Sequence, residues 1–99
     1  MKDLTPDAWL TGWTENGTNI TLPIAAISDL TATEVDATTG DIRMFLFRLV
    51  VELKSVYDAL PDDDQPDTMS FRIARRGDDV DLNIRLQGSP SAFTPDTES

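Results

Sequence analysis

The sequence predicts an α+β fold in which two β-hairpins form a four-stranded sheet and one long helix packs on one face. Apolar residues mirror each other on both sides of Asn16-Gly17 and again on both sides of Gly77-Asp78. Between these segments, apolar residues recur at three- and four-residue steps from Ile42 to Leu60. Mirrored alternation is typical of a hairpin, and the three- and four-residue steps are typical of an amphipathic helix. The expected element order is therefore β-β-α-β-β.

The first hairpin is expected to comprise residues 9–14 and 19–24. Asn-Gly is the strongest short hairpin signal, because both turn residues must adopt positive φ, which asparagine tolerates and glycine accepts freely. With Asn16-Gly17 as a two-residue loop, Trp13 opposes Ile20 and Trp9 opposes Ile24. We expect both tryptophans to lie on the sheet face that covers the helix, where burial in the core is their ordinary role.

The helix is expected over residues 41–60. Asp41 suits the positive end of a helix dipole, and Pro61 ends the helix. Before it, Thr31 and Glu34 have the spacing of a capping box, which predicts one helical turn in the connector. The predicted core stripe of the helix consists of Ile42, Phe45, Leu46, Leu49, Leu53, Val56, Tyr57 and Leu60.

The second hairpin is expected over residues 68–75 and 80–87, joined through Gly77-Asp78. This register sets Met69 against Leu86, Phe71 against Ile84 and Ile73 against Leu82. Residues 1–87 then form a single domain, and residues 88–99 form an extended tail whose composition is that of a linker.

Composition excludes several classes of function. The chain of 99 residues contains no cysteine and no histidine, so thiolate metal sites and the usual general base are both missing. The acidic clusters at residues 62–67 and 78–81 lack the ligand spacing of a calcium loop. We therefore expect a protein that is not an enzyme and has no cofactor and no metal site.

The net charge of −10 bears on the partners of the protein. Phosphate binding needs clustered lysine and arginine, so we expect neither nucleic acid nor an anionic membrane to bind. No apolar run approaches the length of a membrane span, and the first residues do not resemble an export signal. The acidic surface instead favours basic protein partners.

The helix carries a second apolar set outside its core stripe, formed by Met44, Phe47, Val50 and Val51. A helix that covers one sheet needs only one buried face, so the second set predicts contact with another subunit or another protein. The tail offers one aromatic residue, Phe93. The candidate interface residues are Met44, Phe47, Val51 and Phe93, and a homo-oligomer is expected.

Two segments carry a resemblance to known proteins: residues 16–23, Asn-Gly-Thr-Asn-Ile-Thr-Leu-Pro, and residues 38–43, Thr-Thr-Gly-Asp-Ile-Arg. They resemble a diffuse set of small uncharacterised proteins from tailed phages and aquatic bacteria. In that set a hairpin, a Thr-Gly-Asp-x-Arg helix start and a closing hairpin recur in this order. The resemblance covers residues 9–87, identifies no active residues, and implies a virion component.

The expected function is that of a small structural protein, most concretely a capsid cement (decoration) protein of a phage. It would act through the apolar helix face and the tail, and it would be located in the virion. The alternative is an acidic inhibitor that mimics DNA and occupies a basic groove on a nucleic-acid-binding protein, with a cytoplasmic location.

Overall fold

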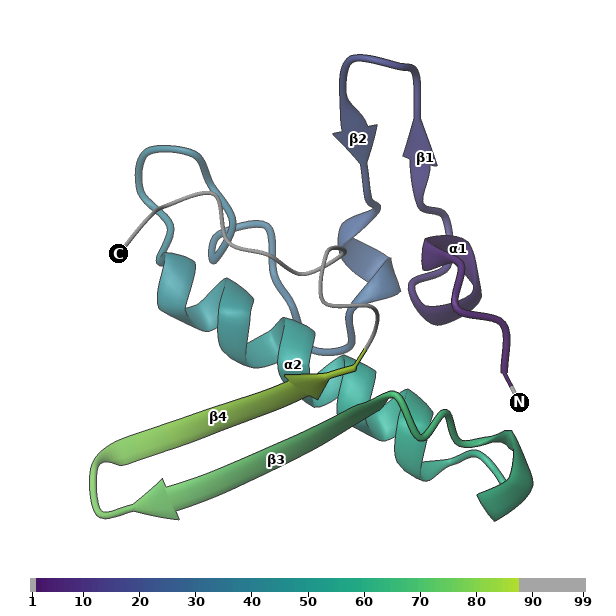
Figure 1. Cartoon of the computed structure of the whole chain (residues 1–99). Coiled ribbons are helices and arrows are strands. Elements are labelled where there is room, and N and C mark those ends of the chain that lie inside the picture. Colours follow the sequence, from purple (N-terminus) through teal and green to yellow (C-terminus); the bar gives the residue numbers. More distant parts are fainter. Residues whose placement is uncertain (1, 88–99) are drawn as a thin grey trace, which may run out of the picture.

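A central helix separates two hairpins in the computed structural model of the chain, which describes residues 2–87 (Figure 1). The fold class is α+β, as predicted. In chain order the elements are helix α1 (Pro6–Trp9), strands β1 (Thr14–Glu15) and β2 (Ile20–Thr21), the 3-10 turn η1 (Ile24–Ala26), helix α2 (Ile42–Asp58), the 3-10 turn η2 (Asp62–Asp64), and strands β3 (Met69–Arg76) and β4 (Asp79–Leu86).

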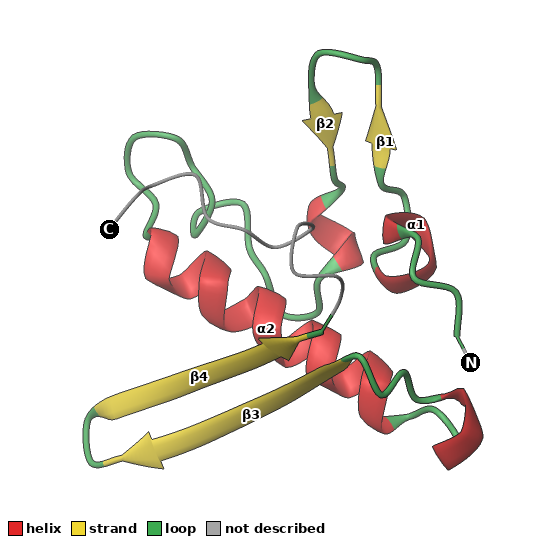
Figure 2. Ribbon diagram, viewed as in Figure 1, coloured by secondary structure: helices red, strands yellow, loops and turns green. Residues whose placement is uncertain are grey.

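The predicted four-stranded sheet is wrong. Among the described residues there are two separate antiparallel sheets, in which β1 pairs with β2 and β3 pairs with β4 (Figure 2). The first hairpin pairs over only two residues of each strand and projects away from α2 (Figure 1). It is too short to add a useful edge to the long second hairpin.

The register of the first hairpin also differs from the prediction. Ile20 pairs with Glu15, where Trp13 was expected. The side chain of Asn16 accepts hydrogen bonds from the backbone N–H groups of Thr18 (2.9 Å) and Asn19 (2.8 Å). Only Gly17 has positive φ in this turn, at 89°, so the chain forms a four-residue connection instead of the two-residue turn.

Trp9 belongs to a helix, whereas a strand was predicted. Pro6 opens α1 at a position where its missing N–H costs nothing, and Leu10 closes it by donating its backbone N–H to the carbonyl of Pro6 at 2.8 Å. Gly12, at φ 93°, then redirects the chain, and its N–H donates to the Asp7 carboxylate at 2.9 Å. The first strand can therefore begin only at Thr14.

The long helix is confirmed within a few residues. Asp41 is its N-cap, and the carboxylate accepts a hydrogen bond from the backbone N–H of Arg43 at 2.9 Å. At the other end, Gln65 donates through Nε2 to the carbonyls of Tyr57 (3.1 Å) and Leu60 (3.3 Å). These bonds satisfy carbonyl groups that the end of any helix leaves without a partner.

The second hairpin has the predicted register, with Met69 opposite Leu86, Phe71 opposite Ile84 and Ile73 opposite Leu82. Its two-residue turn begins with Gly77 at φ 61°, the position that a type II′ turn reserves for glycine.

The capping box in the connector is present, although the chain there forms turns and no helix. The backbone N–H of Thr31 donates to the Glu34 carboxylate at 3.0 Å, and the N–H of Glu34 donates to the Thr31 hydroxyl at 3.2 Å.

The core lies along α2, and two parts of its predicted stripe need correction. Trp9, Leu10 and Ile27 form the buried cluster, and most of the stripe packs against it, but Ile42 and Leu46 are 68% and 47% exposed. Val50, which was expected outside the stripe, is only 4% exposed. Val50 lies two helical turns before Tyr57, whose ring contacts Phe71 of β3, so both residues lie on the helix face that meets the second hairpin.

Candidate protein-binding surface

The buried cluster of Trp9, Leu10 and Ile27 is formed by segments that are held against α2. Trp9 donates through Nε1 to the carbonyl of Asp3 at 2.8 Å, which fixes the ring at the end of α1. The backbone N–H of Ser28 donates to the carboxylate of Glu52 on α2 at 2.9 Å. This bond holds Ile27, which is 2% exposed, against the helix.

Beside this cluster lies an open groove of about 380 Å³, between α2, the base of the first hairpin and the connector. All of its lining residues are apolar. They are Leu10, Trp13, Ile20, Leu22, Pro23, Ile24, Ile27, Leu30, Val35, Phe45, Leu49 and Leu53. Ile20, Leu22 and Pro23 of the first hairpin form one wall of the groove. The strands of this hairpin project away from α2 (Figure 1). We call this the apolar groove.

A second hollow, of about 250 Å³, lies beside the apolar groove and extends toward the end of β4. The two share Leu10, Trp13 and Leu53. The second hollow is also lined by Met69 and Leu86, and by the polar residues Thr68 and Gln87. The wholly apolar lining is therefore a feature of the apolar groove alone.

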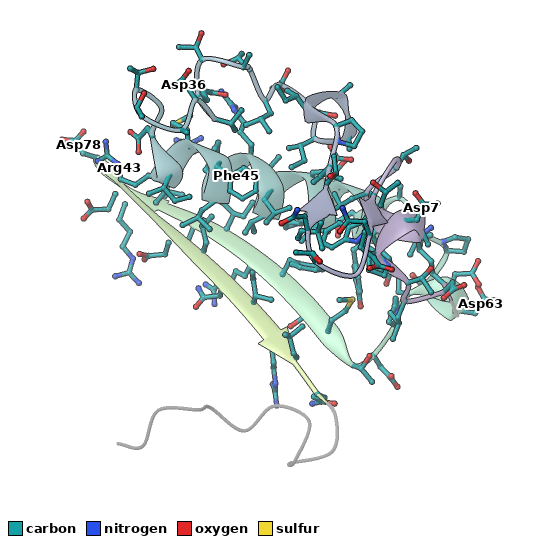
Figure 3. The ribbon with its side chains drawn as sticks, turned by 90° about the horizontal axis from the view of Figure 1, so that it is seen from above. Asp7, Asp36, Arg43, Phe45, Asp63 and Asp78 are labelled. Carbon is teal, nitrogen blue, oxygen red and sulfur yellow. The ribbon has the colours of Figure 1, made fainter. Side chains whose placement is uncertain are left out.

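Two of the residues predicted from the sequence, Met44 and Phe47, line a different hollow. It has a volume of about 710 Å³ and lies between the start of α2 and the tip of the second hairpin. Arg43 and Asp78 line it from either side, and Figure 3 shows both at the same end of the molecule. The Phe47 ring lies 5.7 Å from the guanidinium of Arg48 and 5.8 Å from that of Arg75. Both distances suit cation–π contact.

The other two predicted residues are Val51 and Phe93, and the structure describes only Val51. Val51 is 36% exposed and does not line the hollow that holds Met44 and Phe47. Phe93 lies outside the described residues. The interface role of Met44, Phe47, Val51 and Phe93 stays a prediction.

Several carboxylates near the groove are engaged locally. Backbone N–H groups of Thr38 and Thr39 donate to Asp36, at 3.0 Å each, and lower the pKa of Asp36 to about 2. The backbone N–H of Thr31 lowers the pKa of Glu34, which also faces Arg48 at 3.4 Å. Hydrogen bonds from the side chain and backbone of Arg43 lower the pKa of Asp41. These acids brace the connector and the start of α2.

The described residues contain no group of three acidic side chains placed to hold a metal ion. In the same part of the chain, no helix has the length and apolar character needed to cross a membrane.

Sequence reasoning gave no role to Leu10 or Val35, which both line the apolar groove. Leu10 is 6% exposed and belongs to the buried cluster because it follows α1, a helix that was not predicted. The available signal was Thr5-Pro6-Asp7, since proline at the first helical position followed by an acid is a common helix start.

Comparison with known proteins adds no relative: no family model, no curated protein and no solved structure matches the chain.

Proposed function

We propose that this chain is a non-enzymatic structural protein that acts by binding another protein through the apolar groove. The observation that carries the proposal is the uniform apolar lining of a groove that is continuous with the core. A catalytic or ligand site usually combines apolar walls with a few convergent polar groups. A wholly apolar open groove instead suits the apolar side chains of another protein.

The physical drive for binding is the removal of this surface from water. Ile20 is 66% exposed and Ile24 is 40% exposed, although both line the groove. Covering apolar surface stabilises a complex by about 25 cal/mol for each Å² that leaves water. The net charge of −10 favours a partner with basic residues around its apolar segment, because opposite charges accelerate encounter and disfavour wrong partners.

The more specific form of the proposal is a virion component, such as a phage capsid cement protein, in which the capsid shell is the partner. Its support is the resemblance of residues 16–23 and 38–43 to small uncharacterised proteins of tailed phages and aquatic bacteria. Mass spectrometry of virus particles from the source of the chain tests this form. The protein should be present in the particles in many copies, and its absence from them would contradict it.

The groove itself is tested with a synthetic amphipathic peptide that has leucine on one face and lysine on the other. Trp13 lines the groove, so its fluorescence should shift as the peptide is added. The matched variants are Ile20→Glu and Ile42→Glu. The two isoleucines are almost equally exposed, at 66% and 68%, and each change adds one negative charge, but only Ile20 lines the groove.

We expect Ile20→Glu to weaken peptide binding about tenfold, because a carboxylate is costly to bury against leucine. The affinity of Ile42→Glu for the peptide should stay within about twofold of that of the unchanged chain. A peptide with glutamate in place of lysine should bind less well than the basic peptide. Equal binding by the two variants, or no binding by the unchanged chain, would contradict the groove as a protein-binding site.

Mimicry of DNA is a second candidate, and the net charge of −10 favours it. It requires a continuous row of carboxylates at phosphate-like spacing. Figure 3 shows Asp36 and Asp78 toward one end of the molecule, and Asp7 and Asp63 toward the other. The test is displacement of duplex DNA from a basic DNA-binding protein. Displacement that persists in Ile20→Glu would favour mimicry over the groove.

A further inference from the structure

Strand β4 has one edge that the described part of the chain leaves unpaired. It pairs with β3 over its full length, from Asp79 to Leu86, and with no other strand among residues 2–87. An eight-residue edge without proline or a bulge is a ready template for another strand. On the face toward α2, two of its side chains are half exposed, Ile84 at 49% and Leu86 at 51%.

The register of the hairpin determines which backbone groups lie on that edge. The two-residue turn makes Arg76 and Asp79 a hydrogen-bonded pair, and such pairs alternate with non-hydrogen-bonded pairs along the ladder. The bond from Gln87 N–H to the Thr68 carbonyl, at 2.7 Å, confirms this alternation at the far end. Hence the backbone groups of Val80, Leu82, Ile84 and Leu86 point away from β3.

The sequence of β4 is complementary to itself when two copies run antiparallel about Asn83. In that register Leu82 and Ile84 of one copy exchange hydrogen bonds with Ile84 and Leu82 of the other. On the opposite face, Asp81 of each copy lies beside Arg85 of the other. These oppositely charged residues form non-hydrogen-bonded pairs, in which side chains approach most closely.

Other registers are less favourable. A shift by one residue would set backbone groups that point away from β3 on one copy against groups that point toward β3 on the other. It would also place apolar side chains of one copy on the polar face of the other. A shift by two toward Leu86 removes the pairing of Asp81 with Arg85 and shortens the ladder. A shift by two toward the turn keeps the length and sets Asp79 against Arg85, but it places Asp81 opposite Asn83 and leaves Leu86 outside the ladder. The β3 edge offers no equivalent, because its polar face carries Arg72 and Arg76 and no acidic residue.

We propose that two copies of this chain associate through their β4 strands, antiparallel and centred on Asn83, to form one four-stranded sheet with both α2 helices on the same face. A two-fold axis perpendicular to the sheet relates the copies and closes the assembly. Asp81 keeps the Arg76 of its own chain within 3.3 Å and gains Arg85 of the other copy. This interface does not use the apolar groove, so it can fail without affecting the proposed function, and the reverse also holds.

The first measurement is the mass of the full chain by light scattering, from about 1 µM to about 1 mM at 0.15 M salt. A small strand-to-strand interface predicts a dissociation constant in the micromolar range. The mass should rise from 10.9 kDa to twice that value and no further. A mass that stays at the monomer value at all concentrations would overturn the proposal, as would growth beyond the dimer.

Three variants test the register. Arg85→Asp places two carboxylates together at each end of the interface and should weaken the dimer about tenfold or more. Asp81→Arg combined with Arg85→Asp restores opposite charges and should recover most of the affinity. Arg72→Asp changes the net charge as much as Arg85→Asp does, but on β3, and should have a much smaller effect. Circular dichroism checks that each variant folds.

Amide hydrogen exchange gives a readout that does not depend on mutation. In the monomer, Asp81, Asn83 and Arg85 should be protected by their bonds to β3, while the N–H groups of the alternate residues from Val80 to Leu86 exchange. At dimer-forming concentration the alternate residues should become protected as well. A dimer that leaves them unprotected, or that is indifferent to Arg85→Asp, uses another surface and refutes this one.

Discussion

Phe71 of β3 packs the second hairpin against α2. Its ring meets Tyr57 of α2 edge-on, with centroids 5.9 Å apart and planes at 72°, and it packs against the buried cluster. The Tyr57 hydroxyl is held in turn, because it donates to the carbonyl of Pro66 at 3.0 Å. Ile84, directly opposite Phe71 in the hairpin, is half exposed. The two residues of one cross-strand pair therefore contribute very differently to stability.

Phe71→Ala should lower the free energy of unfolding by about 3 kcal/mol, because it leaves a cavity beside Tyr57. Ile84→Ala should cost less than about 1 kcal/mol in the monomer, since half of its surface already meets water. Urea unfolding at low protein concentration measures both. Similar losses from the two changes would mean that β4, and not only β3, is covered by the helix.

Gly40 occupies a place that no side chain can share. A Cβ atom there would lie 2.4 Å from the carbonyl oxygen of Glu34 and 2.7 Å from that of Asp36, and both are backbone atoms. Gly40→Ala should therefore cost more than about 1 kcal/mol. Gly17→Ala is the control, because its Cβ would meet nothing within 4 Å and only its φ of 89° opposes the change. Thermal unfolding should rank Gly40→Ala as the more damaging substitution.

Single residues of α2 show why a periodic pattern predicted only part of the core. The steps of three and four residues correctly placed Phe45, Leu49 and Leu53 against the buried cluster. The pattern assumed one covered face, but α2 meets the α1 and connector segments on one side and β3 on another. Val50, two helical turns before Tyr57 on the face that meets β3, is 4% exposed, while Leu46 is 47% exposed.

At the scale of elements, the two hairpins differ in what their turns allow. Gly77 needs no help to adopt positive φ, so the two-residue turn and the register of eight paired residues follow directly from the sequence. At Asn16 the side chain bonds to the backbone of Thr18 and Asn19, which lengthens the turn. Local competition between side chain and backbone is invisible to an alternation pattern, and the first register was wrong for that reason.

The connector predicts a pH dependence through Asp36. Its carboxylate accepts the backbone N–H groups of Thr38 and Thr39, and its pKa falls from 3.8 to about 2 in the folded state. A lowered pKa means that the ionised form stabilises the fold, so the contribution is complete above about pH 4 and disappears as the pH falls through 2. Asp36→Ala should lower the melting temperature at pH 7, and the difference from the unchanged chain should shrink between pH 4 and pH 2.

Asp36→Asn separates charge from hydrogen bonding, because asparagine keeps an accepting oxygen at the same position. At pH 7 the melting temperature of Asp36→Asn should lie between that of the unchanged chain and that of Asp36→Ala. A difference that stays constant down to pH 2 would show that Asp36 acts without its charge.

At the scale of the whole molecule, the sequence offered no reason to reject the four-stranded sheet. Apolar and polar residues alternate in both hairpins, and this alternation does not say which part of the protein each apolar face packs against. In the structure the first hairpin forms one wall of the apolar groove, and the second lies alone across α2 (Figure 2). The groove could not be predicted, because the alternation pattern placed the first hairpin in the sheet and not as a wall beside α2.

The chain has eighteen acidic residues and eight basic ones, and folding brings the excess negative charge closer together. Among the described ion pairs, those of Arg43 with Asp41 and Arg76 with Asp81 are largely exposed, and exposed pairs contribute little. Repulsion should therefore dominate the response to salt. The melting temperature at pH 7 should rise between about 20 mM and 500 mM sodium chloride, because the added ions screen the repulsion.

The control is the same salt series near the isoelectric point of about 4.1, where the net charge is close to zero and salt should have little effect. At that pH Asp36 is still ionised, since its pKa is about 2, so its bonds to the connector persist. A melting temperature that instead falls with salt at pH 7 would mean that the ion pairs outweigh the repulsion. The excess of acids would then be tolerated by the fold alone, and it would cease to be an argument for a basic partner.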